Sequence, residues 1–500
     1  MEKLCVENGR LMAGGAPIQL RGFGLGGWLL PEGYMWKFYT KCDRPRRIEA
    51  LIEKLCGAEY AASFWERYYG SYITEADIRL AAENGFNSVR LPFNARHLRD
   101  PGYLRRIDDC VRWCGKHGVY AILDMHAAPG GQTGQNIDDS ERDLPELFMR
   151  PEHRDELCAL WELLAARYRG EAAVAGFDLL NEPLIERDAG YNSLLVPLYM
   201  RLTEAVRRAD PERVVIWEGA HWATDFSVFD ALERDSLPEN LVLQFHKYWS
   251  PPEEESLRAF TDRANRLGLP LYCGESGENN LDWYAFMFPL LDRLGISWSF
   301  WSYKKMSTPN SVSVFPEPGR WGELLSFLDG GAPPARPREI FDDFLACVGS
   351  AEIRREVISA LCRRPPVRIP AEAFDDCAAP GPRRPGADFR PGSPATIVFA
   401  DGHRGAPDFR RYGGEPQPES ERMLVELREG DSVTYRIGHS GPARVRVAAR
   451  SAGGLVADGG LGRVSVGPGG GEAVLRLDGK LRLTCASGRA LLDYIEVFEL

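Results

Sequence analysis

The sequence predicts an α/β protein: a (β/α)8 TIM barrel followed by a C-terminal all-β sandwich domain. Three observations support this prediction. Eight strand-like apolar runs recur in the first part of the chain at the spacing of β-α units. Two of these runs deliver a glutamate at their end, where barrels place functional groups. All twelve tryptophans lie at or before Trp321, and the chain beyond it consists of short strand-like runs and glycine turns.

The eight runs are mostly continuous rather than alternating in hydrophobicity, which is typical of parallel strands buried on both faces. Between them lie helical patterns, such as residues 73–85, 103–118 and 155–170, each of which opens with acidic or capping residues and closes with glycine. Alternation of this kind indicates a closed barrel. The strand runs cover residues 18–25, 88–93, 120–126, 174–182, 213–219, 241–248, 271–276 and 296–303.

The C-terminal part has the pattern of a separate domain. The prolines of RRPPVRIP break any helix that continues from the barrel. Alternating strands then follow over about 130 residues, a usual size for one domain. We therefore predict a catalytic barrel at residues 1–348, a linker at 349–366 and a β-sandwich at 367–500.

Composition argues against several classes of partner. The 500 residues carry a formal net charge of −11, whereas nucleic acids and anionic membranes favour basic patches. The N-terminus lacks the apolar core of a secretory signal, and no later run is long and uncharged enough to span a bilayer. Eleven dispersed cysteines do not suggest a disulfide framework. If no leader has been removed, we expect a cytoplasmic protein with no nucleic-acid or membrane partner; its oligomeric state stays open.

Two glutamates at strand ends carry the chemistry. GFDLLNEP is a buried strand that ends in Asn181, Glu182 and Pro183, and LYCGESG delivers Glu275 in the same way. A glutamate is more often a surface carboxylate or a salt-bridged strand cap. Here each lies in an apolar context at the same edge of a barrel, so the pair favours glycoside hydrolysis, in which one carboxyl protonates the leaving oxygen and the other attacks the anomeric carbon.

Seven segments, in chain order, resemble the strand-end motifs of glycoside hydrolase family five, a family of retaining barrel enzymes of clan A. They are RGFGLGGWLLPE, GFNSVRLPF, LDMHAAPGGQTG, GFDLLNEP, FHKYW, CGESG and SFWSYK. The resemblance covers about the first 345 residues. The opening LGGWLLPE is most similar to the exo-β-1,3-glucanase branch, where the glutamate that matches Glu32 helps to close the pocket around the terminal sugar.

This resemblance implies a role for each matching residue. Glu182 would be the general acid/base and Glu275 the nucleophile, with Arg90 and Tyr248 donating hydrogen bonds to the nucleophile. Asn181 would bind the sugar 2-hydroxyl, a contact that strengthens in the transition state.

Three further positions match the family. His126 and His246 correspond to its two strand-end histidines, although a single buried histidine is more often a core residue. Trp301 corresponds to its sugar-stacking platform. ISWSFWSY offers Trp298 as well, but a separation of three places the two rings on opposite faces of a strand, and we interpret Trp298 as packing.

The C-terminal domain resembles carbohydrate-binding modules of the family six and thirty-five type in IPAEAFD, GDSVTYRIG and LLDYIEV. Such modules usually hold sugars with tryptophan or tyrosine. This domain has no tryptophan, so we expect a structural buttress.

The predicted function is therefore that of a retaining, exo-acting β-glycosidase, which hydrolyses β-glucosides or short β-glucan oligosaccharides by a double displacement with two glutamates. The alternatives are an endo-β-glucanase or β-mannanase on the same barrel, or a carbohydrate-binding protein without catalysis. No cofactor and no metal are expected, because neither a zinc-type cysteine and histidine set nor a GxxxxGK phosphate loop is present.

Overall fold

The computed structural model describes residues 1–381, 384–451, 453–467 and 469–500. They form two compact units. The first contains Met1–Lys247, Ala259–Ser276 and Ile296–Ile353, and the second contains Tyr248–Arg258, Gly277–Gly295 and Arg354–Leu500. The predicted linker at 349–366 contains strand β14 (Glu352–Ile353) and helix α13 (Arg355–Cys362). The predicted domain boundaries themselves stay a prediction.

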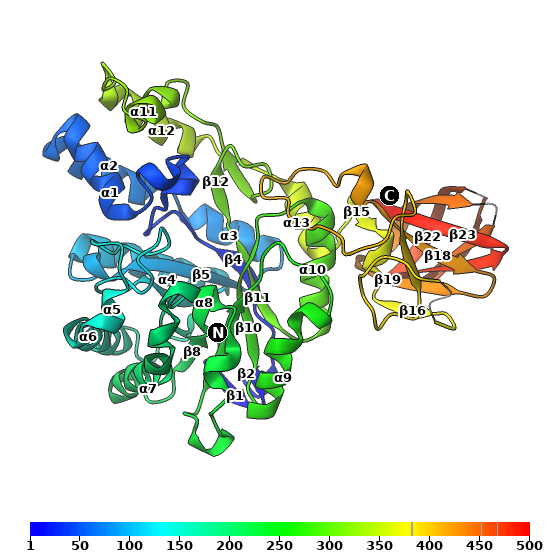
Figure 1. The fold of residues 1–500 in the computed structure, drawn as a ribbon, viewed down its shortest axis with the longest axis horizontal. Coiled ribbons are helices and arrows are strands. Elements are labelled where there is room, and N and C mark those ends of the chain that lie inside the picture. The colour runs from blue at the N-terminus through cyan, green and yellow to red at the C-terminus, as the bar shows by residue number, and fades with distance from the viewer. Residues whose placement is uncertain (382–383, 452, 468) are drawn as a thin grey trace. The chain divides into compact units, whose positions relative to one another are not determined.

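Eight parallel strands close into a barrel in the order β10-β11-β4-β5-β6-β7-β8-β9, which confirms the predicted (β/α)8 fold (Figure 1). Each predicted strand run overlaps one of them. Their bounds are β4 (Arg21–Gly24), β5 (Ser88–Asn94), β6 (Tyr120–Ala127), β7 (Val174–Asp178), β8 (Val214–Glu218), β9 (Leu241–His246), β10 (Leu271–Gly277) and β11 (Ser297–Trp301).

Helices connect the barrel strands, and local sequence sets their ends. In α4, Asp100 caps the start by accepting a hydrogen bond from the backbone of Gly102, and Gly118 ends the helix in the left-handed conformation. The α-helices of the chain up to Gly349 are α1 (Pro45–Cys56), α2 (Ala58–Ser71), α3 (Glu75–Glu83), α4 (Pro101–His117), α5 (Glu146–Met149), α6 (Pro151–Arg167), α7 (Asn192–Ala209), α8 (Ala220–Ala223), α9 (Arg258–Leu267), α10 (Leu281–Arg293), α11 (Trp321–Leu328) and α12 (Pro337–Gly349).

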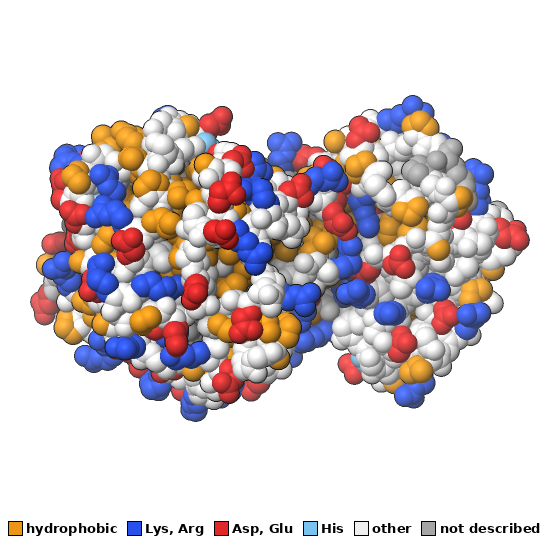
Figure 2. Space-filling model, turned by 90° about the horizontal axis from the view of Figure 1, so that it is seen from below, with side chains coloured by type: hydrophobic (Ala, Val, Ile, Leu, Met, Phe, Trp, Pro, Cys, Tyr) orange, Lys and Arg blue, Asp and Glu red, His pale blue; other side chains and the backbone are white. Residues whose placement is uncertain are grey.

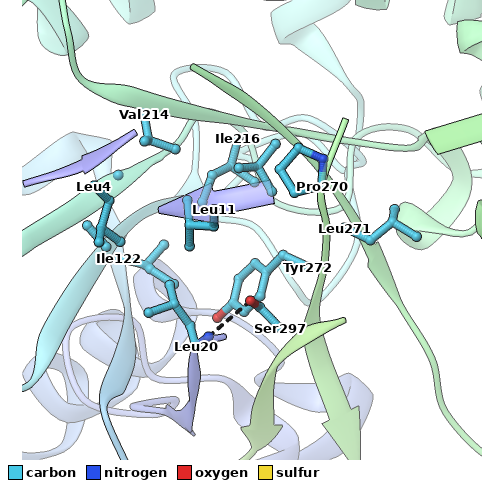
Figure 3. Close-up of a pocket in the computed structure, with 13 residues that line it drawn as sticks. Leu4, Leu11, Leu20, Ile122, Val214, Ile216, Pro270, Leu271, Tyr272 and Ser297 are labelled. Carbon is cyan, nitrogen blue, oxygen red and sulfur yellow. Dashed lines mark hydrogen bonds between the residues drawn. The ribbon is translucent and has the colours of Figure 1, made fainter. Parts of the chain in front are cut away.

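The N-terminal end of the barrel is filled by apolar side chains. The strands β1 (Leu4–Glu7) and β2 (Arg10–Ala13) form an antiparallel hairpin, and Leu4 and Leu11 pack against barrel residues such as Ile122 and Val242. A cavity of about 20 Å³ remains among these side chains, and Figure 3 shows the residues that line it. A closed apolar floor leaves the opposite end of the barrel for chemistry.

The second unit contains an antiparallel sheet region with the strand order β17-β18-β23-β19-β22-β20-β21, to which β15 and β16 add by pairing with β23 and β19. This confirms the predicted all-β domain. The strands are β15 (Val367–Pro370), β16 (Asp376–Ala378), β17 (Thr396–Phe399), β18 (Met423–Arg428), β19 (Ser432–Ser451), β20 (Gly454–Gly460), β21 (Arg463–Val466), β22 (Gly470–Ser487) and β23 (Arg489–Glu499).

Within the described residues, no helix combines the length and the apolar character that crossing a bilayer requires. On the face that Figure 2 shows, basic and acidic side chains are interspersed, and neither sign dominates a large area.

Candidate active site

Strand register brings the polar side chains together. Asp124 of β6 lies opposite Asp178 of β7, and Glu218 of β8 lies opposite Gln244 of β9. His246, at the end of β9, pairs with Glu275 of β10. Because all these strands are parallel, their C-terminal ends meet at one edge of the barrel. Glu182 follows the end of β7 by four residues, at the same edge.

Arg90 is the centre of this group. It is fully buried on β5 and donates to four residues from three other strands and the segment after β7. Nη1 lies 2.6 Å from Glu275 Oε1, and Nε lies 2.8 Å from Asp178 Oδ2. Nη2 lies 2.7 Å from Asn181 Oδ1 and 3.1 Å from Glu218 Oε1. A planar guanidinium with five N–H groups suits such a set of acceptors, whereas an ammonium would not.

The two glutamates singled out by sequence lie close together. His246 Nδ1 is 2.7 Å from Glu182 Oε1 and 3.6 Å from Glu275 Oε2. One ligand atom from each of these three residues lies within 4.8 Å of the other two. Within the described residues, this is also the set whose donor chemistry could hold a metal ion, but the imidazole nitrogen already contacts Glu182.

Asn181 and His126 form the adjacent side of the site. Asn181 Oδ1 accepts from Arg90, which directs its Nδ2 toward His126 Nε2 at 3.4 Å. His126 Nδ1 lies 2.7 Å from Asp124 Oδ2. The amide of Asn181 is therefore oriented by both neighbours. The His126 ring stacks on Trp301 with 5.5 Å between centroids and 7° between planes.

Glycines of β4 and its following loop make room for Trp301. A Cβ atom at Gly24 would lie 2.5 Å from the indole, and one at Gly26 would lie 2.7 Å from it. This is the physical reason for the glycines in RGFGLGG. Trp301 Nε1 donates to the hydroxyl of Tyr34 at 3.0 Å. Trp298 instead packs against Phe86, in agreement with the predicted opposite orientation.

Glu32 lies two residues before Tyr34 in the chain. It is buried, with 2% of its surface exposed, and it directly precedes the short helix η1 (Gly33–Trp36) that carries Tyr34. Gly33 N donates to Asp43 O at 2.8 Å, and the close approach leaves no space for a Cβ at Gly33. The segment with Glu32 is thus held against both Trp301 and the residues around Asp43.

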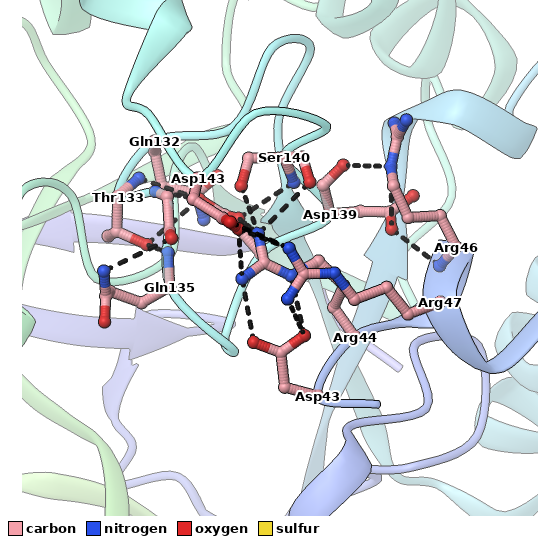
Figure 4. A network of polar contacts seen from close by, with 12 residues as sticks. Asp43, Arg44, Arg46, Arg47, Gln132, Thr133, Gln135, Asp139, Ser140 and Asp143 are labelled. Carbon is pink, nitrogen blue, oxygen red and sulfur yellow. Dashed lines mark hydrogen bonds and ion pairs between the residues drawn. The ribbon is translucent and has the colours of Figure 1, made fainter. Parts of the chain in front are cut away.

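A buried polar network connects the loop after β4 with the loop after β6 (Figure 4). Arg44, 2% exposed, contacts Asp43 at 2.8 Å, Asp143 at 2.9 Å and the Ser140 hydroxyl at 2.5 Å. We call this group the Arg44 clasp. Within the second loop, the Asp138 carboxylate accepts from the backbone of residues 133, 134 and 140.

Burial shifts the pKa values of the group around Arg90. Burial raises the pKa of Asp124 to about 7, although Arg90 opposes the rise. Burial, followed by the charge of Asp178, raises the pKa of Glu218 to about 8. The hydrogen bonds of Glu218 oppose this rise, because Arg90, Gln244 and the Glu182 backbone all donate to its two oxygens, and we assign Glu218 the carboxylate form on this geometry.

The two histidines shift in opposite directions. Burial lowers the pKa of His126 to about 4, so its ring is neutral near pH 7. Burial also acts to lower the pKa of His246, but the charges of Glu275 and Glu218 outweigh it and raise that pKa well above its usual range. The site therefore combines a neutral imidazole beside Trp301 with a cationic one between the two glutamates.

The structure brings together most of the residues that the sequence singled out. Seven of them form one connected group: Arg90, His126, Asn181, Glu182, His246, Glu275 and Trp301. Tyr248 follows β9 by two residues, and its ring lies 5.3 Å from that of Trp249. The predicted contact between Tyr248 and the nucleophile stays a prediction.

Sequence reasoning missed four buried polar residues: Asp124, Asp178, Glu218 and Gln244. Each interrupts an otherwise apolar strand, in YAILDMH, GFDLL, VVIWEG and LVLQFH. A polar side chain inside a strand buried on both faces needs a partner, and that signal could have identified them. It could not have said which strands supply the partners.

In the second unit, the acidic residues of the module-like motifs have protein partners or neighbours. Arg422 forms an ion pair with Asp493 through two nitrogens. Glu372 is buried near Asp282 and Asp493, and this burial raises its pKa to about 8. The type of carbohydrate-binding module stays a prediction.

Comparison with known proteins agrees with this geometry. A β-xylosidase of Phanerodontia chrysosporium is 33% identical over 60% of this chain and 70% of its own length. A probable glucan 1,3-β-glucosidase A of Emericella nidulans is 31% identical over 46% of this chain and 57% of its own length. Endoglucanase C of Acetivibrio thermocellus is 27% identical over 49% of this chain and 87% of its own length.

The family match covers much of the barrel. Residues 53–307 match the family described as Cellulase (glycosyl hydrolase family 5), which spans β5 to β11 and includes both glutamates. The chain therefore belongs to the cellulase family, glycosyl hydrolase family 5, and is a retaining glycoside hydrolase.

Proposed function

We propose that this enzyme cleaves β-glycosides by double displacement, with Glu275 as nucleophile and Glu182 as general acid/base. The observation that carries the proposal is the proximity of their carboxylate oxygens, which lie within 4.8 Å of each other. Retaining glycosidases hold their carboxyls about 5–5.5 Å apart, whereas inverting enzymes need about 6.5–9.5 Å to admit a water. An approach to within 4.8 Å between one oxygen of each carboxyl agrees better with the first spacing than with the second.

The contacts of the two glutamates support the assignment of roles. Arg90 carries a positive charge at any working pH, and among the contacts described it touches Glu275 but not Glu182, so a permanent cation lies against the Glu275 carboxyl. Glu182 instead contacts the His246 imidazole, whose positive charge depends on the neighbouring carboxylates, unlike the permanent charge of an arginine. A nucleophile must stay ionised, while an acid/base must change its state during turnover.

The chemistry then follows in two steps. Glu275 attacks the anomeric carbon while Glu182 gives a proton to the leaving oxygen, and a covalent glycosyl-enzyme forms. Glu182, now ionised, removes a proton from water, which hydrolyses that intermediate with net retention. Asn181, oriented by Arg90 and His126, would hold the sugar 2-hydroxyl, and Trp301 would contact the sugar face.

We further propose exo action on β-glucosides or short β-glucan oligosaccharides. The support is the buried carboxyl of Glu32, carried by a segment that contacts Trp301 through Tyr34. A carboxylate there can accept hydrogen bonds from hydroxyls of a terminal sugar. Two relatives, a β-xylosidase and a probable glucan 1,3-β-glucosidase A, carry names that agree with this mode of action. The similarity to an endoglucanase keeps endo action on a β-glucan as the second candidate.

Two alanine variants test the roles. Glu275→Ala should abolish turnover of every aryl β-glycoside. Glu182→Ala should keep the first step for activated leaving groups, which need no protonation, and azide should restore its turnover by attacking the intermediate. A folded Glu275→Ala enzyme with normal activity would end the assignment. The sugar is identified by screening a panel of aryl β-glycosides, including glucosides, xylosides and mannosides.

A further inference from the structure

We infer that Glu218 is a positioning residue that fixes the acid/base Glu182 through its backbone. The inference rests on the proposed role of Glu182. Glu218 ends β8 and is fully buried. Its Oε2 accepts a hydrogen bond from the backbone N–H of Glu182 at 2.7 Å. No motif of the sequence singled it out.

The backbone of Glu182 needs such a partner. Its φ is +40°, in the left-handed region that residues other than glycine rarely adopt. The segment continues into Pro183, which further restricts the residue before it. A buried N–H without an acceptor would be unsatisfied. The bond from Glu182 N to Glu218 therefore stabilises a conformation that the local sequence does not favour.

The other oxygen of Glu218 links the same carboxyl to the rest of the site. Oε1 accepts from Arg90 Nη2 at 3.1 Å and from the Gln244 amide, and it lies 3.6 Å from His246 Nε2. Arg90 holds Glu275, and His246 contacts Glu182. One carboxyl thus orients the backbone of Glu182 and faces the partners of both glutamates.

An amide cannot replace this carboxyl. Both oxygens of Glu218 receive N–H donors, whereas glutamine has one oxygen and one NH2 group. In Glu218→Gln, the NH2 group must face a donor on one side. We expect Glu182 to lose its alignment with the leaving oxygen, while attack by Glu275 is less affected.

Leaving-group dependence separates this role from general destabilisation. In Glu218→Gln, kcat/KM for phenyl glycosides should fall roughly 10- to 100-fold, as expected when protonation is impaired, but less than threefold for 2,4-dinitrophenyl glycosides. Asp210→Asn is the matched control, because Asp210 precedes the same strand at its other end and is a buried partner of Arg213. It should lower both values equally or not at all.

A double variant gives the stricter test. If Glu218 acts through Glu182, adding Glu218→Gln to Glu182→Ala should cause little further loss with either leaving group. Equal losses with both leaving groups in Glu218→Gln, or full additivity in the double variant, would overturn the inference. If Glu218→Gln does not fold, Glu218→Asp keeps the charge but shortens the reach, and the same criteria apply to it.

The proposed function fails in a different way. If Glu182→Ala loses activity equally toward phenyl and dinitrophenyl glycosides, Glu182 is not the acid/base, whatever the role of Glu218. If the activity of Glu182→Ala depends on the leaving group and that of Glu218→Gln does not, only the inference about Glu218 is wrong.

Discussion

Arg90 shows how a single residue organises the site. Its guanidinium contacts Glu275, Asp178, Glu218 and Asn181, and it lies 3.1 Å from Asp124. Four carboxyls thus surround one cation in a region shielded from water. Buried pairs of this kind contribute little net stability, but breaking one leaves charges without compensation. Arg90 is therefore expected to be as important for orienting the acceptors as for holding the fold.

Arg90→Lys should nearly abolish activity. A lysine has three donors on a flexible stem and cannot reach acceptors spread around a planar fork. We expect kcat to fall about 10³-fold and the free energy of unfolding to fall by roughly 3–5 kcal/mol. Steady-state kinetics and denaturant melts measure both.

Arg213→Lys is the control for Arg90→Lys. Arg213 is a buried arginine that contacts Asp210 and the backbone carbonyl of Tyr168. The Arg213→Lys variant should be less stable than wild type, but its folded fraction should keep most of the activity. Normal kcat in Arg90→Lys would contradict the central position of Arg90.

At the scale of elements, the strands were predictable and their pairing was not. Continuous apolar runs located all eight barrel strands, and two strand-end motifs located Glu182 and Glu275. Asp124, Asp178 and Glu218 escaped prediction because their function depends on register between strands that are far apart in sequence. A one-dimensional pattern states that a residue is buried, but not which acceptor it meets.

The Arg44 clasp is expected to hold two loops rather than to take part in chemistry. Arg44→Met removes its contacts with Asp43, Ser140 and Asp143. We expect a loss of roughly 2–4 kcal/mol of stability and a raised KM, because the segment that carries Glu32 loses support. Arg201→Met, at an exposed ion pair with Asp155, should change neither value. If KM and melting temperature are unchanged in Arg44→Met, the Arg44 clasp does not hold the two loops as described.

Glu372 makes the stability of the second unit depend on pH. Burial raises its pKa from 4.5 to about 8. A carboxyl with a raised pKa binds its proton more tightly when folded, so its contribution is complete below about pH 4.5 and is lost as pH rises through about 8.

Glu372→Gln should therefore stabilise the protein at pH 9, by something on the order of 3 kcal/mol, and change it little at pH 4.5. Melting curves across this range, compared with those of the exposed Glu429→Gln variant, measure the effect. If the melting temperature of Glu372→Gln differs from that of wild type by the same amount at both pH values, this carboxyl does not titrate as described.

For the whole molecule, the first products released from an oligosaccharide distinguish exo action from endo action. Exo action predicts that a tri- or tetrasaccharide releases single monosaccharides first. Glu32→Ala should then weaken recognition of the terminal sugar by roughly 1–3 kcal/mol, as when a buried hydrogen-bond partner is removed. Chromatography of products from the first few per cent of the reaction decides the point. If the earliest products are internal fragments, and Glu32→Ala does not change substrate recognition, the endo-acting alternative is favoured.

Double displacement requires that Glu275 forms a covalent bond to the sugar. The most direct measurement uses the 2,4-dinitrophenyl 2-deoxy-2-fluoro glycoside of the sugar that the enzyme hydrolyses best, because the fluorine slows breakdown of the intermediate. Mass spectrometry of the intact enzyme should show one added fluorosugar, and peptide mapping should place it on Glu275 within LYCGESG. A fluorosugar attached to Glu182 or to any other residue would contradict the account.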